Sequence, residues 1–249
     1  MNYGYQNEYD FVDLYNNKKL DELDNNSQKF LLELFDYVIN NDEPIKCWKN
    51  QMNQKADIFI KYKNYIKSVS LKCGNNNSIH HEQIQDFKRF LGNLGIPYKV
   101  IDYYTSYHYG YMKDKDGKTD YTRSLDSEEY KKYYQEEIDI FNKYINKTKI
   151  IIELIDRFII RGKNSDFDID ALVSGRIDDY IWILKHDLYD LILSKRSLFF
   201  SSPHFACITL GPQKRNVDKE SEHRSDKYMV CGRWNFLHED IINYKDNAI

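Results

Sequence analysis

A β-hairpin pattern between Ala56 and Lys72 constrains the fold of this chain more than any other feature. Two runs of β-forming residues flank the two-residue turn Lys63-Asn64, and polar and apolar side chains alternate along each run. Antiparallel pairing across that turn places Asp57 opposite Ser70, with Lys72 as the diagonal neighbour on the same face. The other face carries a strip of β-formers suited to a core: Ile58, Ile60, Val69 and Leu71. The hairpin therefore predicts a carboxylate, a hydroxyl and an ammonium gathered on one polar face.

These residues resemble the core of a known enzyme family. Asp57, a spacer of about a dozen positions and Ser70-x-Lys72 on the returning strand are similar to the PD-(D/E)xK nuclease motif of many type II restriction endonucleases. The usual proline before the aspartate is Ala56 here, and the usual second acid is Ser70. Members of the superfamily with Ser-x-Lys take the missing carboxylate from the following helix, where Glu82 is expected. The resemblance covers residues from about Glu33 to Leu94.

The resemblance implies a metal-dependent hydrolysis of phosphodiester bonds. Asp57 and Glu82 would bind Mg²⁺, with Mn²⁺ able to substitute, and Lys72 would act on the attacking water or the transition-state phosphate. Ser70 completes the expected catalytic set. Glu33, in the helix before the hairpin, is the alternative second acid. The competing interpretation of Asp57 and Lys72 is an ordinary cross-strand surface pair.

The coarse pattern of the chain predicts an α/β protein with a mixed central sheet flanked by helices. We expect one nuclease domain over residues 1–249, with a restriction-endonuclease-like core at about 27–104 and 197–243 and a helical insertion at about 123–195. Within the core we expect helices from Ser27 to Asn40 and from Ser78 to about Leu94, and strands at Ile45–Trp48 and Tyr98–Tyr104. Strands at Ser197–Ser202, Phe205–Leu210 and Tyr228–Phe236 form the expected C-terminal β segment.

Charge is distributed unevenly along the 249 residues, although the formal net charge is only -3. Residues 1–44 carry ten acidic and three basic side chains, whereas residues 45–75 carry seven lysines and Asp57 as the one acid. This local positive excess would attract a polyanion such as DNA, although lysines also commonly protect sheet edges. Lys214 and Arg215 form a second basic spot after Gly-Pro-Gln, suited to phosphate or base-edge contacts or simply to solvent exposure.

Other sequence signals narrow the class of protein. The four cysteines have no zinc-site spacing, and we interpret them as free thiols in a reducing cytoplasm. No apolar run approaches the length of a membrane span, and the sequence has no Gly-rich phosphate loop and no Gly-x-Ser-x-Gly or His-Glu-x-x-His motif.

The predicted function is a Mg²⁺-dependent endonuclease for double-stranded DNA in a restriction or defence system. The resemblance implies a homodimer and a cognate methyltransferase acting on the same DNA site. The principal alternative is a catalytically inactive nucleic-acid-binding module with a nuclease-like fold, which Ser70 in place of an acid favours. A structural interaction protein with Tyr-rich helices is a third hypothesis.

Overall fold

The computed structural model describes residues 3–52, 54–73, 78–114, 116–163, 167–214 and 224–247. The chain divides into two compact units. The first unit contains Met1–Asn77, Ile155–Leu191 and Phe236–Ile249, and the second contains Ser78–Leu154 and Ile192–Asn235. Each unit has its own sheet and is described separately below.

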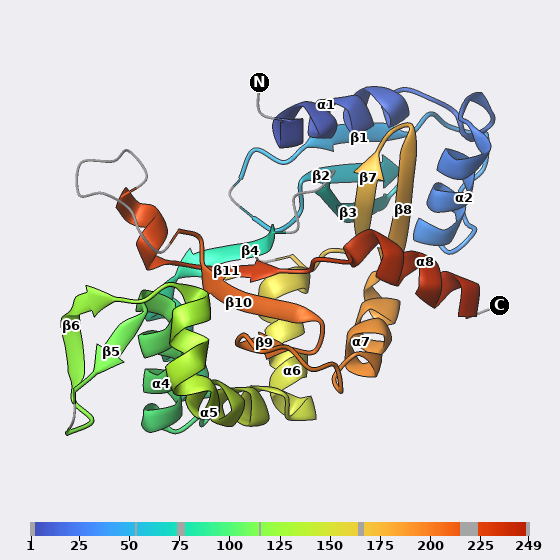
Figure 1. Ribbon diagram of the computed structural model, residues 1–249. Helices are drawn as coiled ribbons and strands as arrows, with labels where there is room; N and C mark the ends of the chain where they lie inside the picture. The colour runs from blue at the N-terminus through green and yellow to red at the C-terminus, as the bar shows by residue number, and fades with distance from the viewer. Residues whose placement is uncertain are drawn as a thin grey trace. The chain divides into compact units, whose positions relative to one another are not determined.

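A five-stranded mixed sheet forms the centre of the first unit (Figure 1). Its strands, in spatial order, are β1 (Lys46–Lys49), β2 (Ile58–Tyr62), β3 (Tyr65–Lys72), β7 (Ala171–Arg176) and β8 (Asp179–Leu184). Neighbouring strands are antiparallel except β3 and β7, which are parallel. The predicted α/β class with a mixed sheet flanked by helices is therefore confirmed.

The predicted hairpin is present in the predicted register. Ile58 pairs with Val69 and Tyr62 pairs with Tyr65, so Lys63 and Asn64 form the two-residue turn. Lys63 has a φ of +52°, a left-handed conformation that two-residue hairpin turns require. The expected strand at Ile45–Trp48 is also found, as β1.

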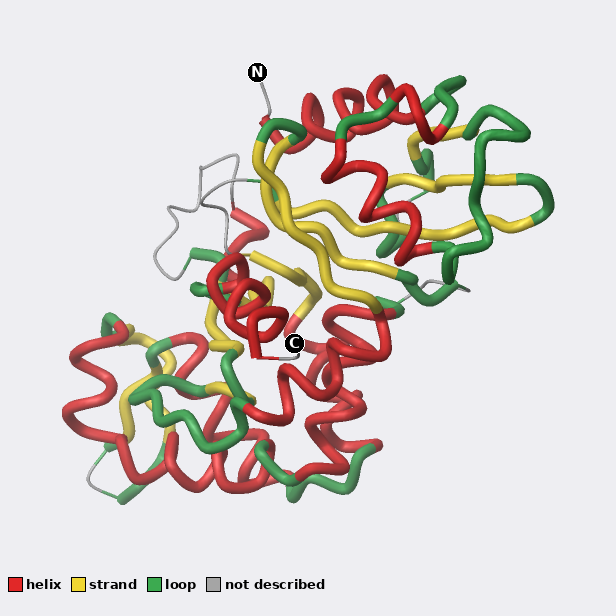
Figure 2. The backbone as a smooth tube through the Cα atoms, turned by 90° about the vertical axis from the view of Figure 1, so that its right-hand side faces the viewer, coloured by secondary structure: helices red, strands yellow, loops and turns green. Residues whose placement is uncertain are grey.

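Helices cover one face of this sheet and bury its apolar strip. Helix α1 (Tyr3–Tyr15) and helix α2 (Asn25–Leu34) contribute aromatic and aliphatic side chains to a core that includes Ile58, Ile60 and Val69. Figure 2 shows these helices alongside the strands. The carboxylate of Asp24 accepts the backbone N–H groups of Asn26 and Ser27 and so begins α2, three residues before the predicted start. The unit is completed by the 3₁₀ helix Leu20–Glu22, the π-helical turn Asp156–Ile160, most of α7 (Lys185–Ser194) and α8 (Leu237–Asn247).

The second unit contains an antiparallel four-stranded sheet in the order β4-β11-β10-β9. These strands are β4 (Ser78–Gln83), β9 (His204–Phe205), β10 (Ile208–Pro212) and β11 (Met229–Arg233). The unit also contains helices α3 (Ile84–Asn93), α4 (Tyr98–Tyr109), α5 (Ser127–Ile145) and α6 (Thr148–Ile155), the 3₁₀ helix Arg224–Tyr228, and a hairpin of β5 (Tyr111–Lys113) and β6 (Thr119–Ser124). Among the described residues, no helix combines the length and apolar character needed to cross a membrane.

Two local predictions are wrong in this unit. Residues from Ser78 begin a strand, because β4 pairs with β11 along its length, and the helix starts only at Ile84. The predicted strand Tyr98–Tyr104 is the first part of α4. Pro97 precedes this helix, and Gly110, with a φ of +71°, ends it. Both residues are typical of helix ends, and here they outweigh the β-forming composition of the segment between them.

The predicted helical insertion at 123–195 is wrong in its second half. Residues 171–184 form the β7–β8 hairpin, which extends the sheet of the first unit through parallel pairing with β3. The C-terminal strands do not complete that sheet either. They pair with β4 in the second unit, and the predicted strand at Ser197–Ser202 is absent from these described residues.

Candidate active site

The candidate site lies where β2 begins and β3 ends, on the sheet face opposite α1 and α2. Asp57 immediately precedes β2, and its backbone N–H donates to the carbonyl of Val69 at 2.9 Å, which continues the hairpin register. Ile58 faces the helical core, so Asp57 faces the other side. Ser70 and Lys72 on β3 lie on that same side.

A compact hydrogen-bond network joins the three predicted residues. The hydroxyl of Ser70 donates to Oδ2 of Asp57 at 3.0 Å, and the ammonium of Lys72 donates to that hydroxyl at 3.0 Å. Nζ of Lys72 lies 3.7 Å from Oδ2 of Asp57. The backbone N–H of Leu71 also donates to Oδ2, at 2.6 Å. The structure therefore brings Asp57, Ser70 and Lys72 together as the hairpin pattern predicted.

The carboxylate of Asp57 is held in one orientation by this network. Ser70 is fully buried, whereas the side chains of Lys72 and Asp57 keep 18% and 24% of their surface exposed, so a ligand can reach them. All the contacts above use Oδ2, which leaves Oδ1 as the carboxylate oxygen that they do not occupy.

Lys55 is a third charged residue beside Asp57 and Lys72, and it was not among the site residues predicted from the sequence. Burial lowers the pKa of the Lys55 ammonium well below its usual value, and the positive charge of Lys72 adds to this effect while Asp57 opposes it. Its aliphatic stem lies beside Gly162. A Cβ atom added at that glycine would lie 3.7 Å from the Cβ of Lys55. Lys55 lies in a bend before β2, so the alternation of side chains along the strand did not indicate its position.

A serine and a histidine from distant segments lie next to Lys72. Ser174 on β7 is the register partner of Lys72, and Nδ1 of His238 on α8 lies 3.3 Å from its hydroxyl. Ser174 is buried. No spacing in the sequence indicated this arrangement, because it depends on parallel strand pairing and on the docking of the last helix.

Glu82 does not occupy the helical position predicted for it. It lies on β4 in the second unit, buried, with Oε1 3.3 Å from Nε2 of His80. A role as the second acid stays a prediction for this residue.

Glu33, the alternative second acid, lies on α2 and belongs to the helical side of the sheet. Its carboxylate accepts a 2.7 Å hydrogen bond from the indole N–H of Trp182 and pairs with Lys245 at 3.2 Å. Trp182 belongs to the same core as Ile58, so these contacts keep Glu33 on the face opposite Asp57.

The donor set of the site allows one mode of Mg²⁺ binding. Within the described ranges, no three His, Cys, Asp or Glu side chains are grouped so that they could hold a metal ion. Mg²⁺ is nonetheless often bound by one or two carboxylates with water and substrate phosphates completing its shell. Asp57 and the carbonyl oxygen of Leu71, which accepts from Lys72 at 3.1 Å, fit that mode.

The predicted DNA-contacting residues belong to the second unit. Lys214 is exposed and lines a small hollow of about 280 Å³ together with Pro212 and Arg233. Arg215 lies outside the described residues.

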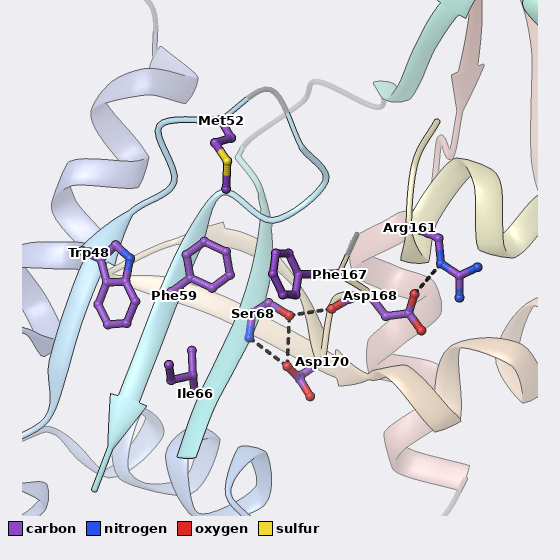
Figure 3. A pocket seen from close by; sticks show the side chains of 9 residues that line it. All are labelled: Trp48, Met52, Phe59, Ile66, Ser68, Arg161, Phe167, Asp168 and Asp170. Atoms are coloured by element: carbon purple, nitrogen blue, oxygen red, sulfur yellow. Dashed lines mark hydrogen bonds and ion pairs between the residues drawn. The ribbon is translucent and has the colours of Figure 1, made fainter. Parts of the chain in front are cut away.

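A larger pocket of about 820 Å³ occupies the same sheet face as Asp57 (Figure 3). Trp48, Phe59 and Ser68 form one row across β1, β2 and β3, because Phe59 is the register partner of both others. The row of Asp57 and Ser70 is the next one on this face. The remaining lining residues are Met52, Ile66, Arg161, Phe167, Asp168 and Asp170.

The sequence matches no known protein-family model, and no curated protein is detectably similar to it.

Proposed function

We propose that this protein is a metal-dependent endonuclease that hydrolyses internal phosphodiester bonds of double-stranded DNA. The observation that carries the proposal is the convergence of Asp57, Ser70 and Lys72, with Lys72 bonded to the hydroxyl that also holds the carboxylate. This is the arrangement expected of a restriction-endonuclease-like core with Ser-x-Lys in place of the usual acid and lysine. The mixed sheet flanked by helices is compatible with such a core.

Each residue of the site has a defined task in this proposal. Asp57 would hold Mg²⁺, or Mn²⁺ in its place, together with the carbonyl of Leu71 and phosphate oxygens. The bound metal would act as a Lewis acid and lower the pKa of the attacking water. Ser70 holds Oδ2 of Asp57 and the ammonium of Lys72 at a fixed separation. Lys72 faces the negative charge that develops on the phosphate, and a bound phosphate would favour the charged form of the nearby Lys55, which burial disfavours in its absence.

The biological setting follows from the resemblance. Enzymes of this kind cut two strands with two copies, so we propose a homodimer that acts in a restriction or defence system. A cognate methyltransferase would then protect the same DNA site. Lys214 and Arg215 are proposed as DNA contacts.

A cleavage assay on long unmodified DNA tests the proposal. We expect the protein to produce discrete fragments with Mg²⁺ and none with EDTA. Asp57→Asn should abolish cleavage, because the neutral amide keeps the shape of the carboxylate but loses its affinity for a divalent cation. Lys61→Ala, on the same face of the hairpin but outside the network, is the matched control. Cleavage by the Asp57→Asn variant at the parental rate would refute the metal-dependent mechanism.

A second candidate is a catalytically inactive nucleic-acid-binding module. The observation that favours it is the single carboxylate of the described network, where Ser70 replaces an acid without supplying its charge. Calorimetric titration separates the two candidates. Mg²⁺ or Mn²⁺ binding that requires Asp57 supports the nuclease, whereas DNA binding that is unaffected by EDTA and by Asp57→Asn, without cleavage, supports the module.

A further inference from the structure

The pocket beside the candidate active site is lined by accessible aromatic rings. The rings of Trp48 and Phe59 stack at 5.8 Å between centroids, and Phe167 meets Phe59 edge-to-face at 6.5 Å. Figure 3 shows Phe59 between the other two rings. Trp48 is 39% exposed and Phe167 is 53% exposed. A planar ring entering the pocket would therefore meet accessible aromatic surfaces.

The charged groups of this pocket are already compensated. Asp168 accepts from Nε of Arg161 at 2.7 Å and also from Lys185. Asp170 pairs with Lys67 at 3.6 Å and accepts the backbone N–H of Ser68 at 2.8 Å. Among the described lining residues, none carries an uncompensated charge of the kind that would select a free anion or a free cation, but they offer polar atoms at the rim of an apolar cavity. That combination is typical of sites for neutral, planar, polar-edged ligands.

The distance to the candidate active site is set by the strand register. Phe59 follows Asp57 by two residues along the hairpin, and Ser68 precedes Ser70 by two, all on one face. Residues two apart on a strand are separated by roughly 7 Å. A base joined through its sugar to a phosphate at Asp57 and Lys72 spans a separation of this order.

We propose that this pocket receives an unstacked nucleobase of the strand whose phosphate is bound at Asp57 and Lys72. The inference rests on the proposed nuclease function and adds a base-holding site to it. Aromatic stacking selects a base by its flat face and needs no particular sequence. The carboxylate of Asp170 and the hydroxyl oxygen of Ser68 line the pocket and can accept hydrogen bonds from the edge of the base, since the hydroxyl of Ser68 already donates within the protein.

Fluorescence of 2-aminopurine in EDTA tests the inference without any cleavage. The probe is a set of short single-stranded thymine oligonucleotides, each with 2-aminopurine at a different position, and the reference is the same set with an abasic site there. We expect at least one position to show quenched emission on binding and to bind more tightly than its abasic reference. Phe167→Ala should weaken this binding by about 5- to 150-fold, the range of a lost base–aromatic stack.

Phe199→Ala is the matched control, because Phe199 is an exposed phenylalanine of the second unit that does not line the pocket. Equal effects of Phe167→Ala and Phe199→Ala, or abasic DNA binding as tightly as the 2-aminopurine probe, would overturn the inference. So would displacement of the probe by tetramethylammonium but not by free adenine, which would identify the pocket as a cation cage.

The same samples separate this inference from the proposed function. If the parental protein cuts DNA in Mg²⁺ but Phe167→Ala changes neither binding nor quenching, the base site is wrong and the nuclease proposal stands. If the quenching depends on Phe167 but no cleavage occurs, the base site stands and the nuclease proposal is wrong.

Discussion

The ammonium of Lys72 lies 3.7 Å from Oδ2 of Asp57, and the hydroxyl of Ser70 is hydrogen-bonded to both groups. The two charges are therefore close but not in direct contact, and a small hydroxyl occupies the position between them. Each member of the pair is also held by the backbone of Leu71, whose N–H donates to Asp57 and whose carbonyl accepts from Lys72. This property distinguishes it from an ordinary surface ion pair, whose side chains point into solvent.

Lys72→Ala should abolish cleavage while leaving folding and DNA binding largely intact. The variant removes the positive charge that faces the reacting phosphate, and loss of one such group in other enzymes lowers the rate by about 10²- to 10³-fold. Plasmid cleavage in Mg²⁺ measures the rate, and thermal unfolding followed by circular dichroism measures folding. With Lys61→Ala as control, parental cleavage by the Lys72→Ala variant would contradict the proposed role of the ammonium.

Ser70→Ala should lower both stability and activity, but each by less than the loss of a charged partner. The hydroxyl is fully buried and makes two hydrogen bonds, so its removal should cost about 0.5–1.5 kcal/mol of unfolding free energy per bond. Without the bridging oxygen, Asp57 and Lys72 lose their fixed separation. Urea denaturation measures the free energy. An unchanged unfolding midpoint together with unchanged cleavage would mean that Ser70 positions neither residue.

The hairpin and its polar face could be predicted from the sequence because they are local. The pairing of Ile58 with Val69 needs only a two-residue turn and the alternation of side chains on either side of it. The orientation of Asp57, Ser70 and Lys72 follows from that register alone.

The rest of the site depends on contacts between distant segments, which a single sequence does not reveal. Lys72 meets Ser174 through a parallel pairing that joins strands about a hundred residues apart, and His238 arrives on the last helix. The predicted helical insertion at about 123–195 covers the β7–β8 hairpin, whose place in the sheet depends on the pairing of β7 with the distant strand β3. Similarly, Ser78–Gln83 is a strand because β11 pairs with it, which overrides the helix-start signal at Ser78.

Asp168→Asn should destabilise the protein near neutral pH and have little effect in acid. The hydrogen bond from Arg161 lowers the pKa of the Asp168 carboxyl and Lys185 adds to this, although partial burial acts against them. A carboxyl whose pKa is lower in the folded state stabilises that state above its unfolded pKa of about 3.9, and this contribution is lost as the pH falls through the folded pKa. Because the pair is partly exposed, we expect at most about 1 kcal/mol.

Urea denaturation at a series of pH values checks this dependence. The difference in unfolding free energy between the parental protein and the Asp168→Asn variant should be largest near pH 7 and should shrink below about pH 4. Asp246→Asn, at an exposed position of α8, is the control. A difference that stays constant down to the acid range would show that the ionised carboxylate of Asp168 is not what stabilises the fold.

Lys55→Met should leave the protein at least as stable as the parent but reduce its activity on DNA. The lowered pKa of Lys55 means that its charged form is disfavoured by burial in the folded state. Methionine keeps an aliphatic stem against Gly162 and removes the buried charge, so the free energy of unfolding at neutral pH should stay the same or rise. A bound phosphate would favour the protonated form of Lys55, which the methionine variant cannot supply, so both cleavage and affinity for DNA should fall. Lys55→Arg keeps a basic side chain and should retain more activity than the methionine variant, as measured by plasmid cleavage and by DNA binding in EDTA.

If Lys55→Met lowers stability and leaves cleavage unchanged, Lys55 serves the packing around Gly162 and not the binding of phosphate.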